Sequence, residues 1–230
     1  MEREYLARTE ALLGGSALER LASSHVLIAG LGGVGGHAFD ALLRSGIGRL
    51  TLVDCDVVTE SNLNRQLLAT LDTIGMAKTE AAAAHARRIS RDVNLTLHTE
   101  RILPETAEEL LSAARPDLVI DAIDDVSAKV ALAVAAGRQG IRILSCLGTG
   151  NRLDPAALTV TDISKTSGCP LARAVRTRLR REGIEHLPVV FSREPARAPL
   201  GEVRVASCAF VPAAAGLLLA AEAVRLLSDT

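Results

Sequence analysis

The chain has 230 residues, of which 48% are hydrophobic, and its formal net charge is −1 at pH 7. A net charge so close to zero excludes a protein drawn to nucleic acid or membrane by overall charge alone. Only one Tyr and three Phe are present. The core must therefore be aliphatic, which is typical of a parallel sheet covered by helices.

Cysteine spacing and the two ends of the chain indicate a cytoplasmic protein. The four cysteines form no C-x-x-C pair, so we expect neither a zinc site nor a disulfide framework. The charged N-terminus lacks the apolar segment of a secretory signal. Glu222 and Arg225 interrupt the apolar run 209–227, which favours a core helix over a membrane span. No membrane partner is expected.

Strands and helices are predicted to alternate along the first two thirds of the chain. In chain order, these elements are one or two short helices at 9–21, a strand at 25–29, a helix at 33–45, a strand at 50–53, a helix at 77–91, a strand at 95–98, a helix at 104–114, a strand at 117–123, a helix at 126–138 and a strand at 141–146. Strand–helix–strand units at this spacing predict an α/β, Rossmann-like, doubly wound and mainly parallel sheet.

The pattern changes after Gly148. An added strand that could run antiparallel is expected next, followed by a basic helix from Pro170 to Arg181. Residues 183–207 contain three prolines and are expected to be irregular, and a helix at 212–227 closes the core. No Pro/Gly/Ser-rich linker is present, so residues 1–230 are predicted to form one domain with added C-terminal strands and an irregular basic crossover segment at about 164–207.

A glycine-rich turn follows the strand at 25–29. Gly30, Gly32, Gly33 and Gly35 form G-x-G-x-x-G between a strand and a helix, where backbone N–H groups and the helix dipole can receive a phosphate. Asp54, nineteen positions after Gly35, can accept both hydroxyls of a ribose. By itself this motif predicts an adenine nucleotide, usually NAD. The alternative is a tight turn without a ligand.

Polar residues beyond the second strand distinguish a site for a nucleoside triphosphate from a site for a dinucleotide such as NAD. Asn62, Arg65 and Lys78 suit a triphosphate, whose charge must be neutralised as pyrophosphate leaves. Asp124 follows the central strand at the edge where ligands bind in such sheets. A carboxylate there could hold Mg²⁺ that bridges phosphate oxygens.

The segments GLGGVGG, LVDCD, SNLNRQ, GMAKTE and DAIDD occur in this order. In order and spacing they resemble the ubiquitin-activating-type adenylyltransferases that include the ThiF, MoeB and HesA proteins, over almost the whole chain. This resemblance implies an enzyme that uses ATP and Mg²⁺. It implies that Asp54 binds the ribose, that Asn62, Arg65 and Lys78 contact the phosphates, and that Asp124 binds the metal.

The same resemblance implies a homodimer, in which a catalytic Arg8 reaches into the neighbouring subunit's site. Within the family, RTEALLGG, SNLNRQLLA, DISKTSGCPLARAVRTRLRREGI and AFVPAAAGLLLAAEAVR most resemble the members that dehydrate threonylcarbamoyladenosine in tRNA. Such members adenylylate the threonyl carboxylate, and the neighbouring carbamoyl group then closes a ring as AMP leaves. The implied partners are tRNA and, beyond it, a cysteine desulfurase or sulfur-acceptor protein.

Positive charge is concentrated in one segment. Residues 165–204 contain nine Lys or Arg and four Glu, a net charge of +5, which leaves −6 for the rest of the chain. Positive charge beside a nucleotide site suits a tRNA backbone, and the scarcity of aromatic residues argues against base stacking. The alternative is a solvated helix face.

Two other functions remain open. One is activation of a ubiquitin-like sulfur-carrier protein with Cys169 taking part, although a structural role for Cys169 at a helix start is favoured. The other is an NAD-binding oxidoreductase, which rests on the glycine turn and Asp54 alone. His37 and Lys129 are interpreted as surface residues outside the site.

Overall fold

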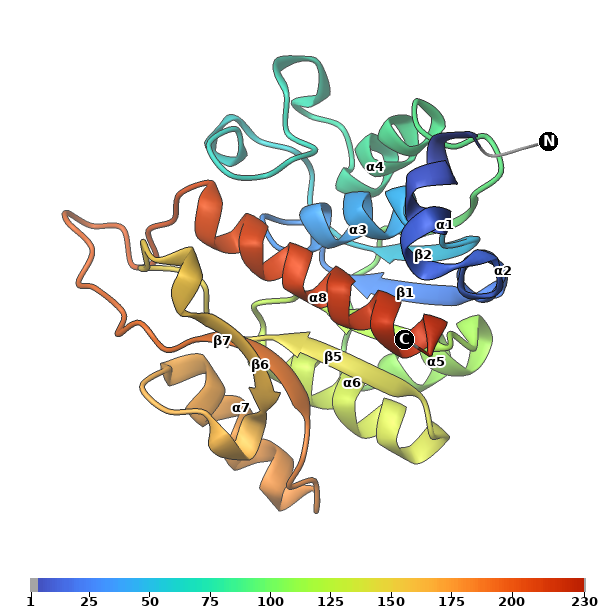
Figure 1. Cartoon of the computed structure of the whole chain (residues 1–230). Helices are drawn as coiled ribbons and strands as arrows, with labels where there is room; N and C mark the ends of the chain where they lie inside the picture. Colours follow the sequence, from blue (N-terminus) through green and yellow to red (C-terminus); the bar gives the residue numbers. More distant parts are fainter. Residues whose placement is uncertain (1–3, 230) are drawn as a thin grey trace.

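The computed structural model describes residues 4–229, in which strands and helices alternate (Figure 1). The strands are β1 (His25–Ala29), β2 (Arg49–Val53), β3 (Asn94–His98), β4 (Leu118–Asp121), β5 (Arg142–Cys146), β6 (Leu158–Asp162) and β7 (Pro188–Ser192). The helices are α1 (Ala7–Leu13), α2 (Gly15–Ser23), α3 (Gly35–Arg44), α4 (Lys78–Arg87), α5 (Ala107–Ala114), α6 (Val126–Gln139), α7 (Pro170–Arg181) and α8 (Phe210–Ser228).

The strands form one seven-stranded sheet in the order β3-β2-β1-β4-β5-β7-β6. Every neighbouring pair is parallel except β6 and β7, which are antiparallel. The chain runs outward from β1 through β2 to β3 and then returns to place β4 on the other side of β1. This reversal leaves a crevice at the carboxyl ends of β1 and β4, where ligands bind in doubly wound sheets. The predicted fold class is confirmed.

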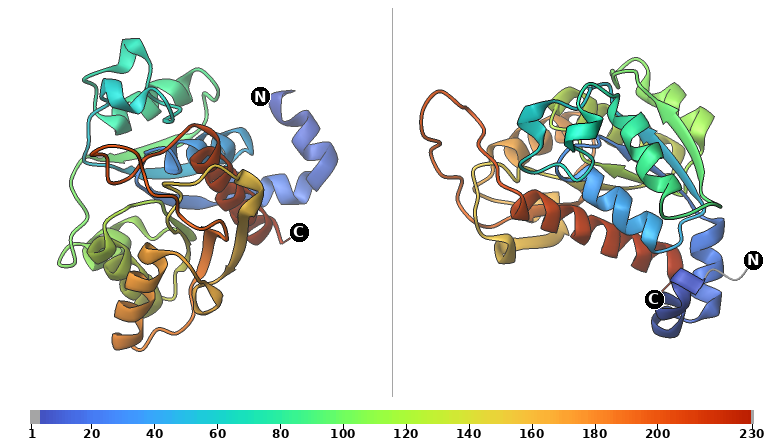
Figure 2. Two further views of the ribbon diagram at one scale, coloured as in Figure 1. Left: turned by 90° about the vertical axis from the view of Figure 1, so that its left-hand side faces the viewer. Right: turned by 90° about the horizontal axis from the view of Figure 1, so that it is seen from above.

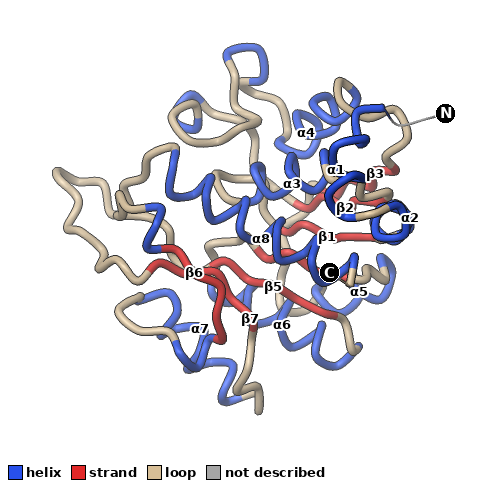
Figure 3. Tube along the Cα trace, viewed as in Figure 1, coloured by secondary structure: helices blue, strands red, loops and turns tan. Residues whose placement is uncertain are grey.

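One strand lies in the segment that is predicted from its prolines to be irregular. β7 occupies part of the 183–207 segment and inserts between β5 and β6 (Figure 3). Pro188 is its first residue, a position that proline tolerates, and Val189 and Val190 are buried. The predicted irregularity is therefore wrong for 188–192. The added antiparallel strand is confirmed as β6.

Two helical layers cover the sheet (Figure 2). Residues of α2, α3, α4 and α8 share one buried cluster with the strands, while α5 and α6 cover the opposite face and α7 extends that layer over β7. α8 is long and apolar enough to cross a membrane by length and composition. Its residues Ala215, Leu219 and Ala223 are nevertheless buried in the first cluster, as expected of a core helix.

Candidate active site

A cavity of about 630 Å³ opens at the carboxyl ends of the central strands. Its walls come from the turn after β1, the residues after β2, the loop between β4 and α6, and the segment that follows β5. Ala196, Val205 and Ser207, from the chain after β7, also line it. This volume is typical of cavities that bind small molecules. The cavity occupies the crevice that the reversed strand order leaves beside β1.

The glycine turn forms the floor because no side chain fits there. Gly30 has φ +89°, and a Cβ on it would lie 2.9 Å from the carbonyl oxygen of Ala122. A Cβ on Gly35 would lie 1.7 Å from the carbonyl oxygen of Gly30. Gly30, Gly32 and Gly33 line the cavity, whereas Gly35 is buried in the first turn of α3. The positive end of α3 therefore begins beside the cavity, where it can stabilise an anion.

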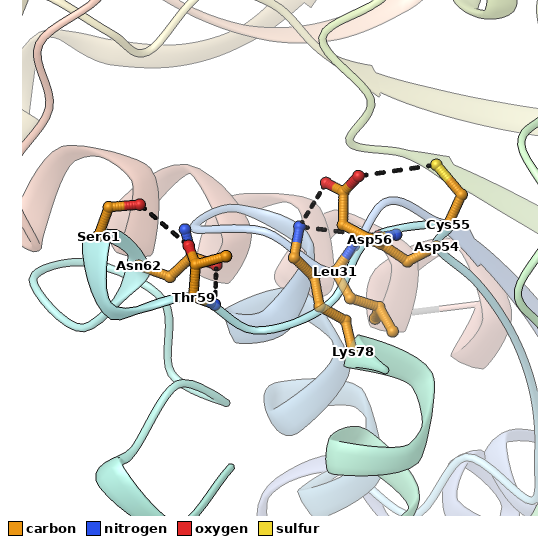
Figure 4. Close-up of polar contacts among 8 residues, drawn as sticks. All are labelled: Leu31, Asp54, Cys55, Asp56, Thr59, Ser61, Asn62 and Lys78. Carbon is orange, nitrogen blue, oxygen red and sulfur yellow. Dashed lines mark hydrogen bonds and ion pairs between the residues drawn. The ribbon is translucent and has the colours of Figure 1, made fainter. Parts of the chain in front are cut away.

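Asp54 follows β2 and joins it to the glycine turn (Figure 4). Its Oδ2 accepts a hydrogen bond from the Leu31 amide at 2.6 Å, and its Oδ1 accepts one from the Asp56 amide at 2.9 Å. A carboxylate oxygen can accept more than one hydrogen bond. Asp54, which lines the cavity, can therefore hold this turn and still receive ribose hydroxyls.

Lys78 is buried behind a second carboxylate. It is the first residue of α4, and its Nζ lies 2.8 Å from Asp56 Oδ2 and 3.7 Å from Asp54 Oδ1 (Figure 4). The hydrogen bond from Lys78 holds the pKa of Asp56 below its usual value. Asp56 lines the cavity and Lys78 does not. The Lys78 ammonium has three donors, so a phosphate that reaches it can replace Asp56 as its partner or share the ammonium with it.

Asn62 and Arg65 lie on either side of a sharp turn and have different environments. Asn62 ends the 3₁₀ turn Glu60–Asn62, and its Oδ1 accepts a hydrogen bond from the Thr59 amide at 3.2 Å. It is buried and does not line the cavity. Arg65 does line the cavity, and its Nη1 donates to the Ser61 carbonyl and to Asn64 Oδ1. Its remaining donors make no recorded hydrogen bond within 4–229, so they can bind a phosphate.

Asp124 is an exposed carboxylate in the loop between β4 and α6, and it lines the cavity. Its neighbour Asp125 is the N-cap of α6 and accepts a hydrogen bond from the Ala128 amide at 2.8 Å. No cluster of three or more His, Cys, Asp or Glu suited to a metal occurs in the described part of the chain. Mg²⁺ bound mainly by phosphates and water needs only one or two carboxylates, so Asp124 fits that role.

A buried ion pair lies beneath this loop. Lys129 is 1% exposed, and its Nζ lies 2.8 Å from Asp121 Oδ2, so its interpretation as a surface residue is wrong. Ser145 Oγ donates to the same Asp121 oxygen at 2.8 Å, and the Ile123 amide donates to Oδ1 at 3.2 Å. A buried carboxylate needs a partner of opposite charge. The position of Asp121 at the end of an apolar strand was therefore the feature of the sequence that could have predicted a buried lysine.

Three other candidates are placed as follows. Arg8 is exposed on α1, a helix that lies beyond the amino ends of the strands (Figure 2), whereas the cavity opens at their carboxyl ends. Cys169 lines the cavity but is buried, and its Sγ accepts a hydrogen bond from the Ala172 amide at the start of α7. His37 is half-buried on α3 and does not line the cavity, and its Nδ1 lies 2.8 Å from the carbonyl oxygen of Gly33. His37 therefore supports the glycine turn.

Comparison with known proteins agrees with this geometry. Residues 6–230 match the ThiF family. A tRNA threonylcarbamoyladenosine dehydratase of Bacillus subtilis is 38% identical over 97% of this chain and 94% of its own length. The Escherichia coli protein of the same name is also 38% identical, over 78% of this chain and 67% of its own length. A solved structure of E. coli TcdA in complex with ATP is 33% identical, covers 99% of this chain and 95% of its own, and has a TM-score of 0.93. The chain therefore belongs to the ThiF family.

Proposed function

We propose that this chain is an ATP-dependent dehydratase of threonylcarbamoyladenosine in tRNA. The observation that carries the proposal is similarity along the whole chain to proteins of that name, which includes 94% of the length of the B. subtilis relative. An oxidoreductase is not favoured, because the similar E. coli structure is an ATP complex. Since tRNA is the substrate, we place the reaction in the cytoplasm. The family resemblance adds a cysteine desulfurase or sulfur-acceptor protein as a further partner.

The cavity supports ATP binding in one orientation. The ribose lies against Asp54, and the phosphates lie over Gly32, Gly33 and the amino end of α3. Arg65 then contacts the triphosphate from one wall, and Lys78 joins it by exchanging Asp56 for phosphate or by sharing its ammonium between the two. Asp124 would hold Mg²⁺, which would supply positive charge to the phosphates. Asn62 acts through the turn that it caps, because its side chain is directed to Thr59.

The chemistry requires two steps and no protein nucleophile. The threonyl carboxylate attacks the α-phosphorus of ATP, a carboxylate–phosphorus bond forms, and pyrophosphate leaves. The carbamoyl group of the same nucleoside then attacks the acyl carbon, and AMP leaves with one of the original carboxylate oxygens. Net loss of water is coupled to conversion of ATP into AMP and pyrophosphate. Because both reacting groups belong to one substrate, holding them in place supplies much of the acceleration.

A homodimer completes the site in this proposal. The exposed Arg8 belongs to α1 at the amino ends of the strands, whereas the cavity of its own chain opens at their carboxyl ends. Two chains paired so that α1 of each lies against the carboxyl ends of the partner's strands would let each Arg8 enter the partner's cavity. Its guanidinium would add a positive charge as pyrophosphate leaves.

The proposed activity is tested by incubating the protein with ATP, Mg²⁺ and tRNA that carries threonylcarbamoyladenosine. Mass analysis of the digested tRNA should show a nucleoside lighter by one water, formed in equal amount with AMP. A reaction without the tRNA modification is the control. AMP release without any change in the nucleoside would refute the proposal.

Activation of a ubiquitin-like carrier protein remains the second candidate, because Cys169 lines the cavity and such a reaction could use a thiol. The structure gives Cys169 a helix-capping role that serine fulfils equally well. We therefore expect Cys169→Ser to retain dehydratase activity within about threefold, measured as AMP formed per modified tRNA. Loss of turnover with an unchanged melting temperature would instead favour a catalytic thiol.

A further inference from the structure

One face of α7 carries a row of arginines. Ala172, Val175 and Leu179 are buried against the sheet layer, which fixes the rotation of the helix. The opposite face is exposed and contains Arg173, Thr177, Arg178, Arg180 and Arg181. Arg176 differs from them, because its Nη1 donates to the Thr166 side chain and to the carbonyl oxygens of Ile163 and Thr166. Arg176 is thus part of the fold, whereas the exposed arginines present charge to solvent.

A groove follows this face and leads to the active-site cavity. It is lined by Gly168, Cys169, Pro170, Arg173, Ala174, Arg176, Thr177, Arg178 and Arg181. Cys169 and Pro170 line the cavity as well, so the groove begins at the rim of the cavity. A ligand that follows α7 from its carboxyl end would therefore arrive at the site where ATP is proposed to bind.

The groove has the chemistry of a polyanion site. No acidic residue lines it, and none of the exposed α7 arginines forms a salt bridge with a carboxylate in the described chain. Arg178 makes one contact, to Ser127 Oγ at 2.8 Å, which leaves most of its donors available. From Arg173 to Arg181 the helix rises about 12 Å, the length occupied by roughly three phosphates on one strand of a duplex. Guanidinium groups bind phosphate through two parallel hydrogen bonds.

We propose that the groove formed by Arg173, Arg178 and Arg181 binds the phosphate backbone of the tRNA and directs the modified nucleotide into the cavity. This inference rests on the proposed function and assigns the surface that recognises its substrate. The groove contains no aromatic side chain on which bases could stack. Recognition here is therefore of the backbone and is independent of base sequence.

The test is the salt dependence of tRNA binding by the triple variant Arg173→Gln/Arg178→Gln/Arg181→Gln. Loss of three phosphate contacts should lower the slope of log K against log salt by about 2 to 3 and weaken binding on the order of 100-fold at 0.1 M salt. KM for tRNA should rise, while the affinity for ATP stays unchanged. The matched control removes three exposed arginines on the other face of the sheet, Arg87→Gln/Arg88→Gln/Arg91→Gln, and should leave the slope within about 0.5 of wild type.

Lysine at the three positions should restore most of the slope, because the charge is retained. If the triple variant misfolds, Arg173→Gln and Arg181→Gln are each expected to lower the slope by about 1, since neither side chain has a recorded partner among residues 4–229. If a variant still binds ATP and its slope of log K for tRNA against log salt equals that of wild type, the inference is overturned. Wild-type protein that fails to convert the nucleoside would overturn the proposed function instead.

Discussion

Replacement of Lys129 by methionine is expected to destabilise the protein by about 3–5 kcal/mol, because Asp121 would keep a buried charge without a partner. Asp121 is 0% exposed, and the remaining donors to its carboxylate are the Ser145 hydroxyl and the Ile123 amide. Neither donor carries a compensating charge. The measurement is the free energy of unfolding from urea denaturation followed by circular dichroism.

The double variant Asp121→Asn/Lys129→Met provides the control for this prediction. An amide at position 121 is neutral: its oxygen can accept the hydrogen bond of the Ile123 amide, while its nitrogen can donate to the Ser145 hydroxyl oxygen, which serves as donor or acceptor. Most of the lost stability should therefore return, as it does when both members of a buried ion pair are replaced by neutral groups. Equal destabilisation of the single and double variants would show that packing of the lysine chain, and not charge, determines the effect.

Arg65→Ala is expected to reduce kcat for AMP formation by a factor of about 10²–10³, because a positive charge is removed where the charge of the leaving pyrophosphate develops. Arg65 is half-buried, and its side-chain hydrogen bonds go to the carbonyl of Ser61 and the side chain of Asn64, which lie on the same turn. Its replacement should thus change the free energy of unfolding by less than about 1 kcal/mol. Single-turnover kinetics with saturating ATP separate this effect from weaker ATP binding.

Arg87→Ala, on the exposed end of α4, is the matched control and should leave kcat at the wild-type value. Arg65→Lys is expected to recover only part of the rate, because an ammonium lacks the planar pair of donors that a phosphate accepts. Wild-type kcat in Arg65→Ala would remove Arg65 from its assigned role.

The architecture was predictable because its strands are short apolar runs separated by alanine- and leucine-rich helices. The ends of the elements with predicted bounds lie within four residues of those observed. β7 was missed because three prolines in 183–207 obscured the run Val189, Val190, Phe191, which is buried between two strands. A proline at the first residue of a strand needs no ladder hydrogen bond, so it does not exclude the strand that follows.

The site was predictable where it depends on the backbone and less so where it depends on side-chain partners. Gly30, Gly32, Gly33 and Asp54 all line one cavity, because their places follow from the strand ends. The partners of Asn62 and Lys78 could not be predicted, because Thr59 and Asp56 are brought to them by local turns. Lys129 was misplaced because its partner Asp121 lies on another element.

Isotope transfer tests the adenylylation of the substrate most directly. Modified tRNA would be prepared with ¹⁸O in both oxygens of the threonyl carboxylate and incubated with the protein, ATP and Mg²⁺. If the carboxylate attacks the α-phosphorus, the AMP formed should carry one ¹⁸O atom and the cyclised nucleoside should retain the other. AMP without ¹⁸O, formed together with the dehydrated nucleoside, would show that the carboxylate is not adenylylated and would contradict the proposed mechanism.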